Sequence, residues 1–415
     1  MSQNKTSNDV INKKKIAVFF GGRTPEHDVS VITGLQVLDA IDQERFEAFP
    51  VYIAPNGAWY VGDILRDRKN YLLNAEGLKN VAEVTLDVKA DRGGVLLPKK
   101  SPFFGTAKPI EFDVAIPACH GLFSEDGTLQ GLFELANVPY TGMRIKASSL
   151  LMDKVTSKYL LQALDIPVLP FAVIKRPNDG YFIAEDELAG ILKPLGFPCI
   201  IKPAHLGSSI GVAKVNNIDE AIACLPAVFE YDDTAIAEPF VENLVEYNVA
   251  VSKVLGRVMT SAIERPKTND ELLDFKQKYM SGGDNKGGAK LSGSKFGDQS
   301  SEGMLSLTRD INPDISYELE QNIRSWAGIM FDAIDGTGAP RIDFIGNSQS
   351  GEIWMNEVNP CPGSFGFFLW EAAKEEPVLF TDFLSHMIDE AIAQNISQSL
   401  PYDPVPNDAR LLRRG

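Results

Sequence analysis

Two strand segments with polar faces, near the C-terminal end, constrain the fold more than any other part of this chain. The segments are "RIDFIG" and "GEIWMNEVN", and the turn "NSQSG" between them indicates that they are neighbours. Residues two apart on a strand share a face, so Arg341 and Asp343 point the same way. Glu357 and Asn359 do likewise on the second strand. Burying these groups without compensation would be costly, so the segments predict a binding site or an ionic network.

If the two polar faces coincide, one arginine, two carboxylates and one amide oxygen surround a common volume. Asp343, Glu357 and Asn359, completed by phosphate and water, would then form the hard-oxygen site that Mg²⁺ prefers. The alternative is an arginine–carboxylate network that only joins the two strands.

A glycine- and serine-rich loop follows an earlier β run in "IIKPAHLGSSIGV". Lys202 ends that β run, and the loop from Gly207 through Ser208 would expose successive backbone N–H groups, which suit phosphate oxygens. The order of residues is not that of a Walker loop. A second lysine, Lys154 in "MDKVTSK", lies on a helix, where a solvated side chain is the ordinary state.

The segment "AEPFVENLVEYNV" has the features of a purine pocket. Phe240 and Val241 would form its apolar walls. Glu238 and the neighbouring backbone would read the edge of the base, and Glu246 would accept hydrogen bonds from ribose hydroxyls. Any amphipathic strand edge looks similar, so this segment alone is weak evidence.

Composition and charge narrow the class of protein. The chain has 415 residues, 44% of them hydrophobic, which is enough for two or three domains. A net charge of −16 argues against nucleic acid or an anionic membrane as a partner. No apolar run reaches membrane-spanning length, and the four scattered cysteines favour reduced thiols in the cytoplasm.

The order of elements predicts an α/β protein. "KKIAVFFGG" predicts a strand and glycine turn, and the apolar spacing of residues 23–41 predicts the helix that follows. Residues 60–110 look irregular and are expected to be mainly loops. Residues 147–166 predict one amphipathic helix ending at Pro167, and a long Gly/Ser/Lys-rich segment after residue 266 predicts a lid or a disordered loop.

Two N-terminal motifs, "GGRTPEHDVS" and "HGLFSEDGTLQG", place Glu26, His120 and Glu125 in turns after strands. Substrates bind at such turns in open α/β sheets. For His120, packing as a hydrogen-bonded core histidine is an equally good interpretation.

These motifs together resemble the D-alanine–D-alanine ligase family of the ATP-grasp superfamily. "FFGGRTPEHDVSVITG", "HGLFSEDGTLQGLFELANVPYTG", "ASSLLMDKVTSK", "IIKPAHLGSSIGV", "RIDF" and "NEVNPCPG" occur in the family's order between about residues 15 and 395. The resemblance implies a three-domain ATP-grasp fold with a parallel N-terminal sheet and nucleotide between the central and C-terminal domains. It divides the chain into a disordered lead (1–14), an N-terminal substrate domain (15–148), a central subdomain (149–236), a C-terminal subdomain (237–400) with a lid at 266–303, and a tail (401–415).

The family resemblance also implies an activity, in which ATP phosphorylates one D-alanine and the amine of a second attacks the acylphosphate to make a peptidoglycan precursor. By position, Glu26 would hold the first ammonium beside His120, Arg341 and Gly363 would stabilise the oxyanion, and Ser208, Tyr279 and Glu26 would lock the lid. The residues expected to bind ATP are Lys154, Lys202, Ser208, Glu238, Phe240, Val241, Glu246 and Lys278. Asp343, Glu357 and Asn359 would bind two Mg²⁺, with Mn²⁺ as a substitute, and members of the family are usually homodimers.

The chain departs from the family pattern where the second amino acid would bind. Phe368 stands where the family has a serine that contacts the acceptor carboxylate, although Ser364 beside Gly363 is a candidate replacement. A related dipeptide ligase with another donor or acceptor is therefore the first alternative. A nucleotide-binding relative without catalysis is disfavoured by the complete set of polar residues, and a dinucleotide oxidoreductase by the absence of G-x-G-x-x-G.

Overall fold

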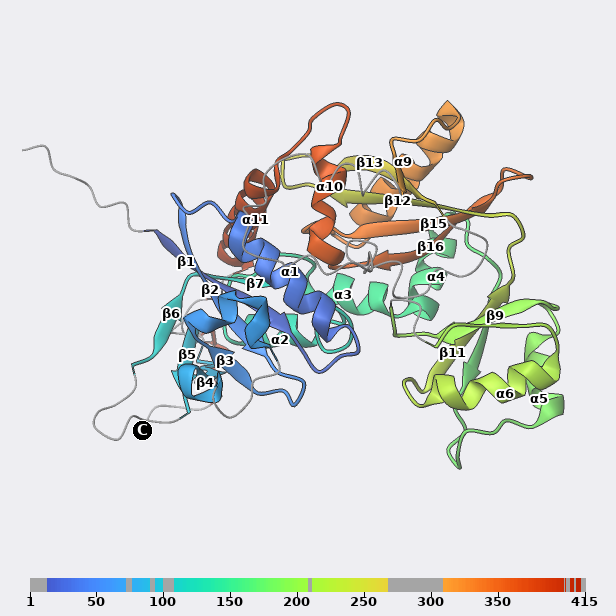
Figure 1. Ribbon diagram of the computed structural model, residues 1–415, viewed down its shortest axis with the longest axis horizontal. Helices are drawn as coiled ribbons and strands as arrows, with labels where there is room; N and C mark the ends of the chain where they lie inside the picture. Colours follow the sequence, from blue (N-terminus) through green and yellow to red (C-terminus); the bar gives the residue numbers. More distant parts are fainter. Residues whose placement is uncertain are drawn as a thin grey trace, which may run out of the picture.

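The computed structural model describes residues 13–71, 77–89, 94–99, 108–207, 211–267, 309–398, 400, 404–406 and 408–411. Almost all of the expected lead and lid, and most of the expected tail, lie outside these residues. The described residues form three β-sheets, which follow one another along the chain and lie in separate regions of the molecule (Figure 1).

The N-terminal sheet has seven strands in the order β6-β5-β4-β3-β2-β1-β7. Its strands are β1 Lys14–Gly21, β2 Phe46–Ile53, β3 Trp59–Val61, β4 Ala82–Leu86, β5 Gly94–Pro98, β6 Ile110–Phe112 and β7 Val114–Pro117. Its helices are α1 His27–Ala40 and α2 Thr128–Leu135, with short 3-10 turns at Asp63–Arg66, Arg68–Asn70 and Gly77–Asn80. β1 is buried from Ile16 to Gly21, as its continuous apolar run predicts.

This sheet corrects two expectations. It is parallel only where β1 pairs with β2 and β7, and the pairings from β2 to β6 are antiparallel. Residues 60–110, expected to be mainly loops, supply those antiparallel strands. The strands have three to five residues and are partly exposed, so their periodicity is too short to stand out from the loops between them.

The central sheet has four antiparallel strands in the order β10-β9-β11-β8, with its own helices. The elements are β8 Ala172–Lys175, α5 Glu185–Leu192, β9 Cys199–Pro203, β10 Ala213–Val215, α6 Ile218–Phe229 and β11 Thr234–Pro239. The two strands expected around Lys202 are confirmed as β9 and β10, and residues 208–210 of the expected glycine loop lie outside the described residues. The expected boundary between residues 236 and 237 falls inside β11, so we propose that the central subdomain ends after Pro239.

Two helices, α3 Ile145–Met152 and α4 Lys154–Ala163, lead into the central sheet. They replace the single helix expected over 147–166. The break is at Asp153, which is extended and whose carboxylate accepts hydrogen bonds from the backbone N–H groups of Val155 and Thr156. A side chain that caps a new N-terminus competes with helix continuation, which apolar spacing alone does not reveal.

The C-terminal sheet has five antiparallel strands in the order β14-β13-β12-β15-β16. They are β12 Leu244–Ser252, β13 Met259–Pro266, β14 Arg309–Ile311, β15 Arg341–Asn347 and β16 Ile353–Asn359. The helices of this part are α9 Tyr317–Ala333, α10 Phe367–Glu371, which follows a 3-10 turn at Gly363–Gly366, and α11 Phe380–Gln398.

The faces of the C-terminal sheet differ in what they contact. One face packs on α9, with Val249, Ile342 and Phe344 buried against Met330 and Phe331. The opposite face meets α10, and there a single core joins the C-terminal and N-terminal parts. That core includes Val18, Phe20, Val37, Ala250, Trp370, Phe383 and Met387. The central sheet has a separate core around Ile201, Leu225 and Phe229.

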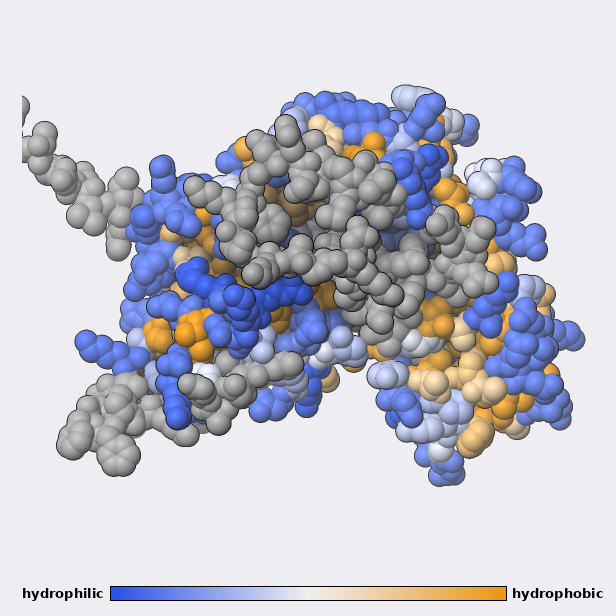
Figure 2. All heavy atoms as spheres, viewed as in Figure 1, coloured by the Kyte–Doolittle hydropathy of each residue, from blue (hydrophilic) through white to orange (hydrophobic). Residues whose placement is uncertain are grey.

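The distribution of hydrophobic residues on the surface also differs between the central part and the rest of the molecule. On the face drawn in Figure 2, hydrophobic residues gather over the central sheet and its helices, and hydrophilic residues predominate along the outer edges. No helix among the described residues is long and apolar enough to cross a membrane.

Candidate functional site

The expected polar strand pair is confirmed. β15 and β16 pair antiparallel with Arg341 opposite Asn359 and Asp343 opposite Glu357. Arg341 donates to Asp343 from Nε and Nη2, at 2.6 and 2.7 Å, and Asn359 Nδ2 donates to Asp343 Oδ2 at 3.0 Å. Arg341, Asp343 and Asn359 therefore form an ionic network of the kind that was the alternative to a metal site, and Glu357 lies opposite Asp343 beside them.

The donor set also fits a hard cation. Asp343 Oδ1 accepts one of these hydrogen bonds and keeps acceptor capacity, and the Glu357 side chain is partly exposed. Two carboxylates and an amide oxygen next to one another are the ligands expected for Mg²⁺. Arg341 would remain beside them as a fixed positive charge.

The polar row is longer than the sequence indicated. Asn248 on β12 lies between Asp343 on β15 and Glu264 on β13. One polar row therefore crosses four strands, from Glu357 on β16 to Glu264. Asn248 Nδ2 donates to Glu264 Oε2 at 3.2 Å, and both side chains are buried. The sequence analysis missed Asn248 and Glu264, because only the register of neighbouring strands aligns residues this far apart in the chain.

Buried lysines face this row from the central part of the molecule. Lys154 Nζ lies 3.4 Å from Glu357 Oε2 and donates to the backbone oxygen of Leu206 at 2.5 Å. Lys202 Nζ donates to Asn356 Oδ1 at 3.1 Å. Lys154 is only 7% exposed, so the ordinary solvated state does not hold for it. The structure thus brings together the lysines and the carboxylates that were expected to share a site.

Glu238 is held between two lysines rather than left open. Its carboxylate oxygens lie 2.5 Å from Lys158 Nζ and 2.7 Å from Lys202 Nζ. Burial alone would raise the pKa of Glu238, but the charges of Lys202 and Lys158 lower that pKa to about 2. Burial lowers the pKa of Lys158, against the opposing effect of Glu238.

Lys158 is a third site residue, after Asn248 and Glu264, that was not expected from the sequence. It is fully buried and lies four residues after Lys154 on α4, so both face the same side of the helix. The spacing of the two lysines in "MDKVTSK" carried this signal.

His120 links the N-terminal part to the end of β16. Its Nδ1 lies 2.8 Å from the backbone oxygen of Cys361, and its Nε2 lies 2.8 Å from Thr33 Oγ1. A carbonyl oxygen only accepts, so Nδ1 carries the proton and Nε2 accepts from Thr33. Burial lowers the pKa of His120 to about 4, which keeps the ring neutral. Thr33 Oγ1 in turn accepts from the backbone N–H of Ser364 at 3.1 Å.

Two carboxylates lie beside that link. Glu125 accepts from the backbone N–H of Gly121 at 2.6 Å and from that of Cys361 at 2.8 Å. Burial, and then the negative charge of Glu26, raise the pKa of Glu125 to about 8. Glu26 is 6% exposed and its carboxylate touches Gly121 and Gly207, where a Cβ would lie 2.5 and 3.1 Å from its oxygens. A cationic group would be well placed next to this pair.

The turn after Gly363 has an unusual backbone. Ser364 and Phe365 have φ of 51° and 54°, a left-handed conformation that non-glycine residues rarely adopt. Phe365 is buried in the core, and Ser364 Oγ forms a hydrogen bond with Gln36 Oε1. The strained turn that begins at Gly363 is therefore held in place by core burial and by hydrogen bonds that Ser364 donates to α1.

Phe368 occupies the position where the family pattern has a serine, and its ring faces an arginine. The guanidinium of Arg309 lies 5.0 Å from the centre of the Phe368 ring, and its Nη1 is 2.8 Å from Glu264 Oε1. Arg309 Nε is buried without a hydrogen-bond partner among the described residues. The far end of the polar row is thus an Arg309–Glu264 ion pair, with the guanidinium beside Phe368 of α10.

Of the remaining residues expected in the site, three are described by the structure and three are not. Phe240 and Val241 follow β11 and Glu246 lies on β12, all half-buried, with Lys214 Nζ 3.7 Å from the centre of the Phe240 ring. Ser208, Lys278 and Tyr279 lie outside the described residues.

Two family profiles match consecutive parts of the chain. Residues 15–143 match the profile described as the D-ala D-ala ligase N-terminus, and residues 160–389 match that of the D-ala D-ala ligase C-terminus. A D-alanine–D-alanine ligase from Heliobacterium modesticaldum is 32% identical over 404 residues, covering 94% of this chain and 99% of that protein.

Two solved structures have a similar fold over nearly the whole chain. The D-alanine–D-alanine ligase from Coxiella burnetii has a TM-score of 0.71 at 22% identity, covering 93% of this chain and 96% of that chain. The VanG D-Ala:D-Ser ligase from Enterococcus faecalis has a TM-score of 0.69 at 28% identity, covering 92% and 99%.

The three sheets and the polar site between them define an enzyme of the ATP-grasp fold. Within that class, the chain belongs to the D-alanine–D-alanine ligase family. The resemblance found in the motifs is thereby confirmed.

Proposed function

We propose that the chain joins two D-alanines into D-alanyl-D-alanine, with ATP converted to ADP and phosphate, for peptidoglycan precursor synthesis. The observation that carries this function is the meeting of Asp343, Glu357 and Arg341 with Lys154 and Lys202 at the junction of two sheets. Phosphoryl transfer requires positioned positive charge more than covalent help from the protein.

Nucleotide would bind between the central and C-terminal sheets. Lys154 contacts Glu357 of the polar row, Lys202 contacts the neighbouring Asn356, and both lysines would contact the phosphates. Phe240, Val241, Glu238 and Glu246 would hold the adenosine part. For Glu238, the ion pairs with Lys158 and Lys202 imply that it acts partly by fixing Lys202. Ser208 and Lys278 complete the proposed set.

Asp343, Glu357 and Asn359 would hold Mg²⁺. When bound, the metal neutralises phosphate charge and orients the transferred group. Two ions, with Mn²⁺ as a substitute, are the finer form of this proposal.

The first D-alanine would bind between the N-terminal part and the turn after β16. The paired carboxylates Glu26 and Glu125 suit its ammonium, and His120 lies next to them. Transfer of the γ-phosphoryl group to a carboxylate oxygen of this D-alanine gives an acylphosphate and ADP. Arg341 and the backbone N–H of Gly363 would stabilise the oxyanion that forms next.

In the second half of the reaction, the amine of the second D-alanine, having lost a proton, attacks the carbonyl carbon. The tetrahedral intermediate expels phosphate and leaves the peptide bond. An acylphosphate is labile in water, so solvent must be excluded. Ser208 and Tyr279, with Glu26, are proposed to close the site.

A second candidate function differs only in the acceptor. The positively charged Arg309 on Phe368, together with a similar solved structure that is a D-Ala:D-Ser ligase, favours testing acceptors other than D-alanine. Ser364 is a further candidate contact for the acceptor carboxylate.

The oligomeric state and location are part of the same proposal. We infer a homodimer, measurable by light scattering, and a cytoplasmic location. ATP is available there, and the four free thiols would stay reduced.

The test is phosphate release from ATP with purified protein across D- and L-amino acids, D-serine and D-lactate. D-alanine alone should sustain turnover, whereas a requirement for a different second substrate would favour the second candidate. No release with any of them would refute the ligase assignment.

Asp343→Asn should lower kcat by about 10³-fold or more, because it removes charge where the transferred phosphoryl group is held. Asp389→Asn, which removes a surface carboxylate paired with Arg45, is the control and should leave turnover unchanged. Near-normal activity of Asp343→Asn over a magnesium titration would refute the metal assignment.

A further inference from the structure

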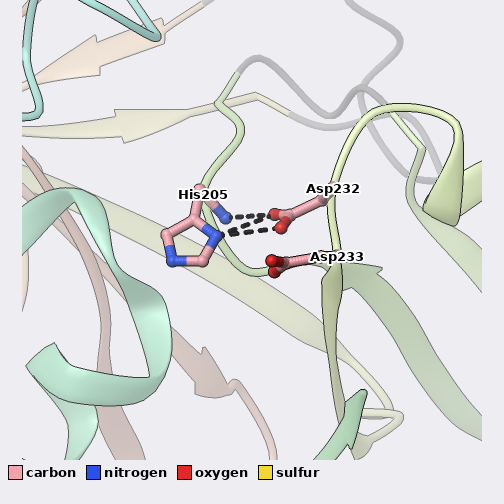
Figure 3. Close-up of side chains that lie close together, drawn as sticks. All are labelled: His205, Asp232 and Asp233. Atoms are coloured by element: carbon pink, nitrogen blue, oxygen red, sulfur yellow. Dashed lines mark hydrogen bonds and ion pairs between the residues drawn. The ribbon is translucent and has the colours of Figure 1, made fainter. Parts of the chain in front are cut away.

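His205 lies outside the site just described, directly after β9, in an ionic cluster with two aspartates (Figure 3). Its Nδ1 is 2.9 and 3.1 Å from the two carboxylate oxygens of Asp232, and its backbone N–H donates to the same carboxylate at 2.7 Å. Asp232 also accepts from the backbone N–H of Thr234 at 3.0 Å, so it is fixed at the start of β11.

A second carboxylate lies on the other side of the ring. His205 Nε2 is 3.8 Å from Asp153 Oδ2, an ion-pair distance, and Asp153 is the residue that caps α4. The carboxylates of Asp153 and Asp232 raise the pKa of His205 to about 10. The ring is therefore an imidazolium at neutral pH, with one ring nitrogen directed at each aspartate.

His205, Asp232 and Asp233 also have the side-chain types of a metal site, but in this structure they form an ionic cluster. His205, Asp232 and Asp233 have potential ligand atoms within 4.8 Å of one another. A histidine binds a metal through a neutral ring nitrogen, and here Nδ1 is already engaged by the Asp232 carboxylate. Asp233 instead accepts from Thr234 Oγ1 at 2.7 Å.

The segment that contains His205 is attached at three successive residues. Ala204 O accepts from the backbone N–H of Lys154 at 3.0 Å, and Leu206 O accepts from Lys154 Nζ at 2.5 Å. Between them, His205 connects the segment to Asp232 and to Asp153, the residue before Lys154. The His205 ring therefore lies between the segment Ala204–Gly207 and the start of α4, and its position affects both.

We propose that His205 is a positioning residue for nucleotide binding, whose imidazolium holds the N-terminus of α4 against the segment Ala204–Gly207 and so places Lys154 for the phosphates. The proposal rests on the proposed function in assigning Lys154 to ATP. It adds that a cation at position 205 is required for that placement.

The charged groups facing the ring set the expected pH dependence. They are Asp153, which caps α4, and Asp232 and Asp233 from the turn before β11. Arg176 after β8, and Glu230 and Tyr231 after α6, line the same surface hollow. The negative charges of the aspartates stabilise the protonated ring. The protonated ring therefore persists through neutral pH, and its contribution is lost only as the pH rises through about 10.

The experiment compares His205→Ala, His205→Arg and His386→Ala. His205→Ala should weaken binding of Mg-ATP, measured by calorimetry, and raise the KM for ATP by about tenfold, with kcat changed less than threefold. An arginine keeps a fixed cation between the aspartates, so His205→Arg should recover most of the affinity. His386→Ala removes a histidine from α11, far along the chain from this segment, and should match the parent.

The charge is read independently by nitrogen NMR of protein labelled at histidine. At pH 8, His205 should show two protonated ring nitrogens, and His120 should show a neutral ring protonated at Nδ1. ATP affinity of the parent should fall above pH 10 more steeply than that of His205→Arg.

Three results would overturn the proposal: unchanged ATP binding in His205→Ala, no recovery in His205→Arg when that variant has the parent's melting temperature, or a neutral His205 ring at pH 8. Calorimetry needs no turnover, so parent protein that binds ATP but joins no amino acids would contradict the proposed function and not this inference.

Discussion

At the scale of single residues, the charges of the site are decided by partners from distant parts of the chain. Glu238 on β11 looks like an ordinary edge residue in the sequence, yet it is buried between Lys158 and Lys202. Removing one partner of such a cluster leaves a buried charge without compensation, which costs about 3–5 kcal/mol. Its importance for stability follows from those two contacts.

Glu238→Gln should therefore lower the free energy of unfolding at pH 7 by about 3 kcal/mol. The folded pKa of Glu238 is about 2, below the usual 4.5, so its contribution is full above pH 4.5 and is lost as the pH falls toward 2. Urea unfolding at pH 7 and at pH 3 measures the difference.

The gap between parent and Glu238→Gln should narrow at pH 3. Glu230→Gln, an exposed change at the end of α6, is the control and should stay within about 0.5 kcal/mol of the parent. A gap that does not change with pH would contradict the ion-pair explanation.

At the scale of elements, α10 carries Phe368, the position where the sequence departs from the family pattern, and β14 carries Arg309, which lies over its ring. Phe367 and Phe368 are adjacent but have different partners. Phe367 stacks on Phe380 at 4.9 Å between ring centres, within the core, whereas Phe368 lies under the guanidinium of Arg309. Adjacent residues of one helix thus contact the core in one case and a charged side chain in the other.

Phe368→Ala should raise the KM for the acceptor amino acid about fivefold, because losing the ring under Arg309 removes roughly 1 kcal/mol of orienting interaction. The KM for ATP should not change. Steady-state kinetics with varied acceptor and saturating ATP measure the effect.

Phe367→Ala is the matched control, expected to lower the melting temperature while leaving the acceptor KM unchanged. Equal acceptor KM values for the parent and Phe368→Ala would separate α10 from acceptor binding.

At the scale of the whole molecule, one core joins the first and last parts of the chain. Residues of β1 and α1 share a cluster with α10, α11 and β12, and the central sheet has a core of its own. In Figure 1, α1 accordingly lies between the N-terminal sheet and α10, and the central sheet projects to one side. The N-terminal and C-terminal parts should therefore lose structure together.

Phe383→Ala tests this coupling. Phe383 is fully buried on α11 and stacks on Trp370 at 4.9 Å between ring centres, so its truncation should cost about 3–5 kcal/mol. Hydrogen exchange should speed up in β1 and α1 as well as in α10 and α11, and should change little in α6 and β9.

Phe229→Ala in the separate core is the matched control and should give the opposite pattern, with faster exchange in α6 and β9. Faster exchange confined to α11 in Phe383→Ala would contradict a shared core.

Sequence alone determined the features that depend on local spacing. The polar strand pair, the strands on either side of the glycine loop after Lys202, α1, α6 and the family followed from period-two alternation, apolar spacing and motifs in order. Local rules were insufficient where short strands gave no period, as in β3 to β6, and where one capping aspartate divided α3 from α4.

Only the tertiary structure decided which charges meet. Strand register placed Asn248 and Glu264 in line with Asp343, and packing between sheets directed Lys154 at Glu357. Burial kept His120 neutral, whereas paired aspartates kept His205 charged, although both histidines look alike in the sequence. Ionisation depends on neighbours and on access of water, and neither is a property of sequence spacing.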